Sequence, residues 1–137
     1  MTNHDFPATS QVLLEEIGQI AVTVSDLKRS RAFYQDVLGM RFLFDAGPMS
    51  FFQCGKVRFA IGTSDKPASP GATILNFRVP DIKQAYTLLQ AKGVEFAQPS
   101  HLVARMPDHD LWLAFLRDPD ANPIALMCEL ATGASAP

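Results

Sequence analysis

The chain has 137 residues, of which 47% are hydrophobic and 19% are charged, and its formal net charge is −2. This is the composition of one globular domain with a hydrophobic core. No run of Lys and Arg supports binding to nucleic acid or to an anionic membrane surface. No apolar stretch approaches the roughly 18–20 residues that span a bilayer, and the N-terminus lacks the pattern of a secretory signal. We therefore expect neither a nucleic-acid partner nor a membrane partner.

The two cysteines, Cys54 and Cys128, form no CxxC pair and lie in apolar, strand-like runs. Cysteines without a disulfide framework are typical of a reducing compartment. The sequence therefore predicts a cytoplasmic protein in which both thiols are buried as small hydrophobic groups.

The first half of the chain, about residues 16–64, predicts one strand, one helix and three further strands. Hydrophobic residues recur at helical spacing over 27–38. Ser25 or Asp26 is placed to cap this helix, and Gly39 stands where a left-handed residue often ends one. Alternating aromatic and branched residues predict strands at 19–24, 40–46, 49–55 and 56–62.

The second half, about residues 72–131, repeats this order. A helix is predicted over 82–92, with Asp81 as its cap and Gly93 at its end. Its apolar face is expected to include Ile82, Ala85, Leu88 and Leu89. The strands are expected at 73–79, 94–98, 111–118 and 123–130.

The two halves are an internal repeat. The segment "VSDLK" at 24–28 matches "VPDIK" at 79–83, in front of each helix. Neither half can bury both faces of its sheet alone, so the two are expected to combine. We predict an α+β fold in which two βαβββ modules form a barrel-like cup of mixed sheet with the helices outside. This single domain would cover 16–131, between flexible tails at 1–15 and 132–137.

The repeat and two motifs resemble the vicinal oxygen chelate superfamily, also called the glyoxalase/bleomycin resistance protein/dioxygenase superfamily. The segment "VSDLKRSRAFYQDVLGM" is similar to the first helix of that family. The segment "FLRDPDANPIAL" is similar to its late turn and last strand. The resemblance covers roughly residues 17–130 and implies the same paired βαβββ fold. It also implies a homodimer, because members of the family commonly pair.

The resemblance implies a divalent metal in the cup, bound by one residue from each of four strands. The ligands in the family are His, Glu or similar residues, which suit transition metals. In this chain the four places carry over to Gln19, Ala60, Ile74 and Ala125. Only Gln19 has a donor atom in its side chain, and an uncharged amide is a weak ligand. We therefore predict no metal at the usual place and no cofactor; a divalent metal on other ligands is the alternative.

Strand alternation places several polar residues on the cavity side of the predicted cup. The candidates for ligand binding are Gln19, Thr23, Arg58, Asn76, Arg78 and, at the rim, Trp112. Small residues beside them suit a small organic ligand with a few polar groups. The alternatives are a closed, dry core without a cavity and, for Trp112, a place in the core.

The second half has a longer connection, "PSHLVARMPDHD", before its third strand. His101 and His109 within it are candidate general bases, although a solvated loop is the commoner structure for such a segment. In "DPDANP", the residues Asp118, Asp120 and Asn122 are better explained as turn residues than as catalytic carboxylates. Ala121 replaces the family's glycine in this turn, which is expected to shift the left-handed position to Asn122.

Three functions are compatible with these residues. The first is a protein that binds a small organic molecule in its cup without the family's metal, as in the drug-sequestering branch. The second is a lyase, isomerase or dioxygenase that uses non-standard residues or an unusual metal site. The third is an interaction module whose cup is filled by its own side chains.

Overall fold

The computed structural model describes residues 12, 15–65, 70 and 73–131. The predicted tails lie almost entirely outside these residues. The first module consists of β1 (Gln19–Thr23), α1 (Leu27–Ala32), the π-helical segment η2 (Phe33–Val37), β2 (Arg41–Ala46), β3 (Met49–Cys54) and β4 (Val57–Gly62). The second consists of β5 (Leu75–Arg78), α2 (Ile82–Ala91), β6 (Phe96–Arg105), β7 (His109–Arg117) and β8 (Pro123–Ala131). The predicted α+β class with two βαβββ modules is confirmed.

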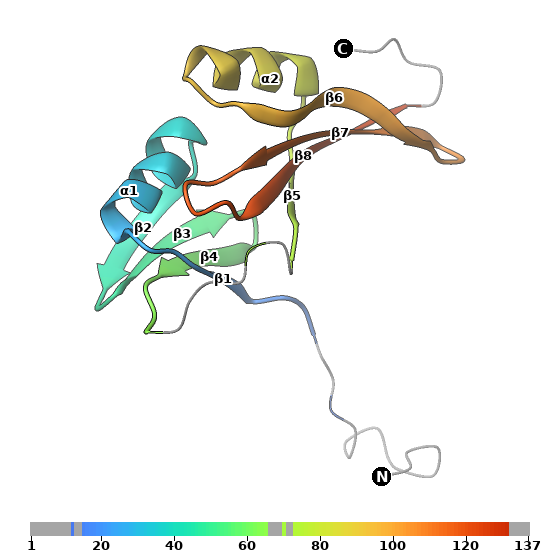
Figure 1. The fold of residues 1–137 in the computed structure, drawn as a ribbon. Coiled ribbons are helices and arrows are strands. Elements are labelled where there is room, and N and C mark those ends of the chain that lie inside the picture. Colours follow the sequence, from blue (N-terminus) through green and yellow to red (C-terminus); the bar gives the residue numbers. More distant parts are fainter. Residues whose placement is uncertain (1–11, 13–14, 66–69, 71–72, 132–137) are drawn as a thin grey trace.

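Each module forms its own four-stranded sheet (Figure 1). The strand order is β1-β4-β3-β2 in the first sheet and β5-β8-β7-β6 in the second. In both sheets the first strand pairs in parallel with the last, and the other pairs are antiparallel. Among the described residues no strand pair joins the two sheets, so the sheets do not close into one hydrogen-bonded barrel. The barrel-like closure in our prediction is therefore corrected to two separate sheets.

Both helices begin at an aspartate, as the sequence predicts. Asp26 has an extended backbone, and its carboxylate accepts from the N–H of Arg29 at 3.0 Å. Asp81 does the same for Gln84, also at 3.0 Å. Each carboxylate satisfies one of the free N–H groups in the first helical turn. Of the two caps considered for the first helix, Asp26 is the one used.

The first helix is not α-helical to its end. The predicted helix over 27–38 changes to π geometry in η2, where the N–H of Leu38 donates to the carbonyl of Phe33 at 2.9 Å. Such widened turns are uncommon and have no simple signature in a single sequence. Within η2, Tyr34 is fully buried, with its ring 4.9 Å from that of Phe59.

The second helix follows its predicted pattern except at one residue. Ile82 and Leu89 of α2 are buried, and Ala85 packs against the core. Leu88 was expected on the same face but is 55% exposed. Leu88 lies one position away from the buried row, so the rotation of the helix brings it to the edge of the interface.

The connection over 99–110 is not the long loop expected. β6 continues through Arg105, and β7 starts at His109, so only a short turn remains between them. Leu102 and Ala104 pair with Trp112 and Leu111 across the hairpin, with a register shift between Leu102 and Ala104. Pro99 is tolerated because β6 is an edge strand, where a missing N–H costs little.

One hydrophobic core serves both modules. Its buried cluster takes Phe59 and Ile61 from the first sheet and Leu116 and Ile124 from the second. In Figure 1, α2 covers the second sheet, and α1 lies on the first sheet beside the β7–β8 turn. In the described part of the chain, no helix is long and apolar enough to cross a membrane.

Candidate functional site

Side chains along β1 alternate between two environments. Ile20, Val22 and Val24 pack in the core, so Gln19, Ala21 and Thr23 lie on the opposite face of the sheet. We call this face of each sheet, turned away from the core, the cup face. The strand register extends it by pairing Gln19 with Arg58, Ala21 with Ala60 and Thr23 with Gly62. In the second sheet it pairs Asn76 with Ala125 and Arg78 with Met127.

The predicted ligand-binding residues on the cup face differ in what they contact. Gln19 and Arg58 are neighbours on adjacent strands, and both are exposed. The exposed Asn76 donates to the carbonyl of Ile74 at 3.4 Å. Thr23 is half-buried, and its carbonyl accepts from the amide of Asn122 at 3.3 Å. Gln19 and Arg58 are therefore an exposed polar pair on the cup face of the first sheet.

The four places to which the resemblance carries the family's metal ligands hold side chains that do not suit a divalent metal. Ala60 and Ala125 are fully buried and have no donor atom, and Ile74 is a 48% exposed aliphatic residue. Gln19 alone carries an oxygen donor. Among the described residues, no group of three or more His, Cys, Asp or Glu side chains is arranged to hold a metal ion. The residues present do not fit the family's divalent metal, because tight sites use three or four good ligands.

A charged network lies at one end of the cup face in the second sheet. The Nδ1 atom of His109 is 2.8 Å from Asp108 Oδ1, and its Nε2 atom is 3.1 Å from Glu129 Oε2. Glu129 also lies 3.4 Å from the guanidinium of Arg78. The hydrogen bond from His109, together with a backbone hydrogen bond, holds the pKa of Asp108 below its usual value. Both ring nitrogens of His109 therefore have a carboxylate partner in this network.

Sequence reasoning missed Glu129, which joins two of the predicted residues. The signal was present, because Ala125, Met127 and Glu129 follow the period of two along β8. It also missed the aromatic pair Phe44 and Phe51, whose rings stack at 4.9 Å. A register shift between Phe42 and Phe44 places Phe44 opposite Phe51, and strand alternation alone does not reveal that shift.

His101 and Trp112 lie on different faces of the second sheet. His101 pairs with Leu113, which pairs with the cup-face residue Met127. Its Nδ1 lies 2.7 Å from the carbonyl of Pro99, which can only accept, so Nδ1 is the donor in this contact. Trp112 pairs with the buried Cys128 and packs against the hydrophobic core. The structure therefore favours the core position for Trp112 and brings His101 to the cup face.

The segment 118–122 is a turn that joins the modules, as its residues suggest. Asp118 is buried and accepts from the N–H groups of Asp120 and Asn122 at 2.9 and 2.8 Å. It also accepts from the hydroxyl of Tyr34 at 2.7 Å, and with burial this raises the pKa of Tyr34 far above its usual value. The left-handed residue is Ala121, at φ 67°, not Asn122 as expected. Asn122 is held by its own bonds to Asp118 and Thr23, which leave the strained conformation to Ala121.

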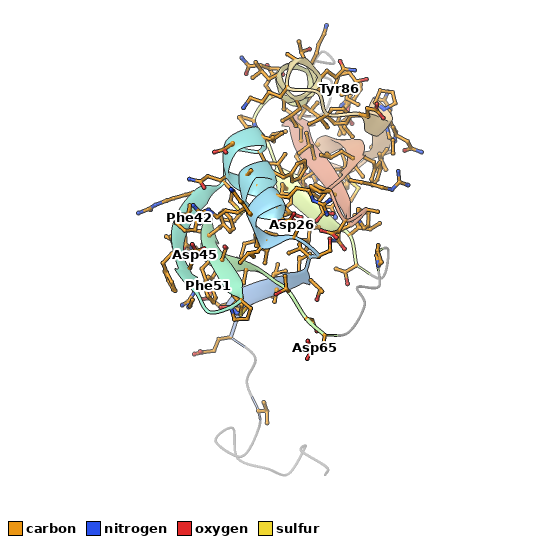
Figure 2. The ribbon with its side chains drawn as sticks, turned by 60° about the vertical axis from the view of Figure 1, so that its left-hand side comes forward. Asp26, Phe42, Asp45, Phe51, Asp65 and Tyr86 are labelled. Carbon is orange, nitrogen blue, oxygen red and sulfur yellow. The ribbon has the colours of Figure 1, made fainter. Side chains whose placement is uncertain are left out.

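The turn also contacts the start of the first helix. Asp120 accepts from the N–H of Ser25 at 3.0 Å and from the hydroxyl of Ser30 at 3.4 Å. Figure 2 shows Asp26, which begins this helix, near the middle of the molecule, with Phe42 and Phe51 on the first sheet. Asp118 and Asp120 link the two modules through these bonds, so they are not free for catalysis.

Comparison with known families identifies the class of protein that has these paired modules and cup faces. A profile of the Glyoxalase/Bleomycin resistance protein/Dioxygenase superfamily matches residues 16–126. The chain therefore belongs to this superfamily.

Individual relatives agree with this assignment. The chain is 30% identical over 126 residues to a Bacillus subtilis protein called uncharacterized protein YraH, covering 79% of this chain and 94% of that one. A glyoxalase/bleomycin resistance protein/dioxygenase from Nocardioides has a similar structure, with a TM-score of 0.71 at 19% identity; the match covers 94% of this chain and 92% of that one. A lactoylglutathione lyase from Agrobacterium tumefaciens has a TM-score of 0.67 at 21% identity, over 84% and 94% of the two chains. These solved structures support the fold, and their activities do not transfer at such identities.

Proposed function

We propose that this protein binds a small organic molecule on its cup face without the family's usual metal. The observation that carries the proposal is the set of residues at the four metal places, three of which have no donor atom. Polar side chains remain around them, with Gln19 beside Arg58 on one sheet and Asn76 on the other. Such a wall can orient a ligand by hydrogen bonds, but it cannot polarise a substrate as a metal would.

The metal part of the proposal is tested by adding Ni²⁺, Zn²⁺ or Mn²⁺ to purified protein. Titration calorimetry and elemental analysis after dialysis should show no stoichiometric ion. A variant that restores the family's ligand types, with Gln19→His, Ala60→Glu, Ile74→His and Ala125→Glu, should bind the ion and gain thermal stability. Stoichiometric metal in the unmodified protein would contradict the proposal.

The ligand part is tested by native mass spectrometry of protein isolated from cells. We expect a retained small molecule that Gln19→Ala and Arg58→Ala both release, because each removes hydrogen-bond donors from the cup face. Lys28→Ala, an exposed change on α1, serves as the control. Bleomycin is a direct probe, since the family is named partly for resistance to it. If no mass is retained and no compound library member binds, the interaction module becomes the better explanation.

A homodimer is part of this proposal. The side chain of Phe44 is 47% exposed and that of Ile74 48%, which leaves apolar surface on both cup faces of one chain. A second copy would cover them and complete the cup. Sedimentation is expected to give about 30 kDa, twice the 15.0 kDa of one chain. Phe44→Arg should shift the protein toward monomer, and a wild-type monomer at micromolar concentration would argue against pairing.

The alternative is a small-molecule enzyme of the lyase, isomerase or dioxygenase type. The position of His101 favours it, because the ring lies on the cup face and its Nδ1 is held by the carbonyl of Pro99. A base so placed can take a proton from a bound substrate. Turnover of lactoylglutathione or a related thiol adduct that is lost in His101→Ala, while Gln19→Ala mainly raises KM, would establish an enzyme.

A further inference from the structure

A cavity lies between the modules, beside α2 and core residues of the second sheet. Its volume is about 540 Å³, and it extends from α2 to the β2 and β3 ends of the first module. Phe77 and Leu126 line it, and both residues pack with the hydrophobic core. We call this cavity the junction groove. Its volume falls within the range of roughly 300–1,000 Å³ typical of small-molecule sites.

The walls of the junction groove are mostly apolar. Leu88 and Leu89 of α2 line one side, and Val37 and Leu38 from the end of the first helix line another. Leu88 is the residue that departs from the predicted buried face, and it is 55% exposed at this edge. Leaving a leucine exposed beside an open apolar cavity costs free energy that an apolar ligand would recover.

The charged residues of the groove are all cationic. Arg41, Arg78 and Lys92 line it, and no Asp or Glu does. The guanidinium of Arg78 is held by Glu129 at the cup face, so it contributes little charge here. Arg41 is exposed and forms no ion pair with a described residue. The groove therefore combines apolar walls with two cationic side chains, Arg41 and Lys92.

Lys92 is held in place by the first module. Its ammonium group donates to the carbonyls of Asp36 and Val37, at 3.2 and 3.3 Å. These carbonyls belong to the π-helical segment of the first module. An ammonium group has three donors, so one remains for another acceptor. Because the side chain is already ordered by the first two bonds, a ligand would pay little entropy to use the third.

We propose that the junction groove binds an amphipathic organic anion, of the class of medium-chain carboxylates. The chain of such a molecule would lie against Phe77, Leu126 and Leu88, and its carboxylate would accept from Lys92 and Arg41. Charge-assisted bonds of this kind are about twice as strong as neutral ones. Cys54 also lines the groove, and burial raises the pKa of its thiol, so it serves as a neutral wall rather than as a nucleophile. Arg41 pairs with Gln53, which pairs with Arg58, so this side of the groove adjoins the cup face of the first sheet. Lys92 and Leu88, which the cup-face proposal does not use, distinguish the two sites.

The test compares decanoate with 1-decanol, both below the concentration at which they aggregate. Titration calorimetry should show one decanoate bound per chain, and the uncharged alcohol should bind at least about tenfold more weakly. Decanoate should also slow the alkylation of Cys54 by iodoacetamide, followed by mass spectrometry of the modified peptide. Equal binding of the alcohol, or no binding of decanoate, would overturn the proposal.

Variants locate the site. Lys92→Ala and Arg41→Ala should each weaken decanoate binding by about fivefold to tenfold, while Lys83→Ala, an exposed lysine on the same helix, should leave it unchanged. Leu88→Ser tests the apolar wall at an exposed position, where folding is least affected. Binding that survives both Lys92→Ala and Leu88→Ser, or that is lost in Arg58→Ala on the cup face, would place the anion elsewhere and refute the assignment.

Discussion

The two modules start their helices in the same way. The N-cap residues Asp26 and Asp81 have φ and ψ of −136° and 103°, and −141° and 102°. Each accepts a hydrogen bond from the N–H three residues later. The short repeat in the sequence therefore encodes a shared local structure, a capped helix that follows a strand.

The modules differ immediately after this shared start. The first helix turns into a π-helical segment that buries Tyr34, while α2 stays regular for 10 residues and leaves Leu88 exposed. The turn over 118–122 of the second module holds Tyr34 through Asp118. The matching hairpin of the first module is a short turn at Gly55, with no carboxylate that reaches the other half. The repeat thus builds each module, and residues outside the repeat join them.

The largest expected effect comes from breaking the junction with Asp118→Ala. Asp118 accepts four hydrogen bonds from the turn and from Tyr34, and its removal leaves buried donors without partners. We expect the free energy of unfolding to fall by about 3–4 kcal/mol in urea denaturation. The exposed Asp65, labelled in Figure 2, supplies the control Asp65→Ala, which should change it by less than about 0.5 kcal/mol. A similar small loss in both variants would mean that the turn does not join the modules.

The equivalence of the two caps is tested next. Asp26→Ala and Asp81→Ala should each lower the free energy of unfolding by about 1 kcal/mol, because each removes one N-cap bond. If the modules are equivalent at this point, the two losses agree within a few tenths of a kcal/mol. A much larger loss for Asp26→Ala would show that the cap also supports the junction beside Ser25.

What could be predicted from the sequence follows the same division. The order of elements and the capping aspartates come from local pattern, and the structure confirms both. The π-helical segment, the extension of β6 through Arg105 and the exposure of Leu88 depend on contacts between distant residues. Periodicity within one window does not contain those contacts.

The candidate site shows the same limit. Strand alternation identified Gln19, Arg58 and Asn76, whose cup-face positions follow from their own strands. It did not find that Glu129 holds His109 and Arg78, because three strands contribute to that network. The junction groove was also not predicted, since its walls come from both modules.

The turn itself offers a stabilising change. Ala121 has φ 67°, a conformation that costs an L-residue about 1 kcal/mol and costs glycine little. Ala121→Gly should therefore raise the free energy of unfolding by about 0.5 kcal/mol, after the entropy that glycine gains in the unfolded chain. Asn122→Gly should lower it, because the amide of Asn122 bonds to Asp118 and Thr23. If Asn122→Gly instead raised the free energy of unfolding and Ala121→Gly lowered it, Asn122 would be the left-handed residue of the turn.

The smallest expected effect is a pH dependence that separates Asp120 from the rest of the junction. Burial alone would raise the pKa of Asp120, but the hydrogen bonds from Ser25 and Ser30 and the charge of Arg29 outweigh it and hold the pKa below its usual value. A carboxylate whose folded pKa is depressed stabilises the protein above its unfolded value of about 3.9 and loses that contribution as the pH falls through the folded value.

The free energy of unfolding, measured in urea, should therefore fall more steeply from about pH 5 to pH 2 in the wild type than in Asp120→Asn, which cannot take up the proton. Asp65→Asn, at an exposed aspartate just after the first module, should keep the wild-type slope. Equal slopes in the wild type and Asp120→Asn would show that the bonds from the start of α1 do not favour the charged form of Asp120. Lowering the pH would then not weaken the contacts of Asp120 between the modules.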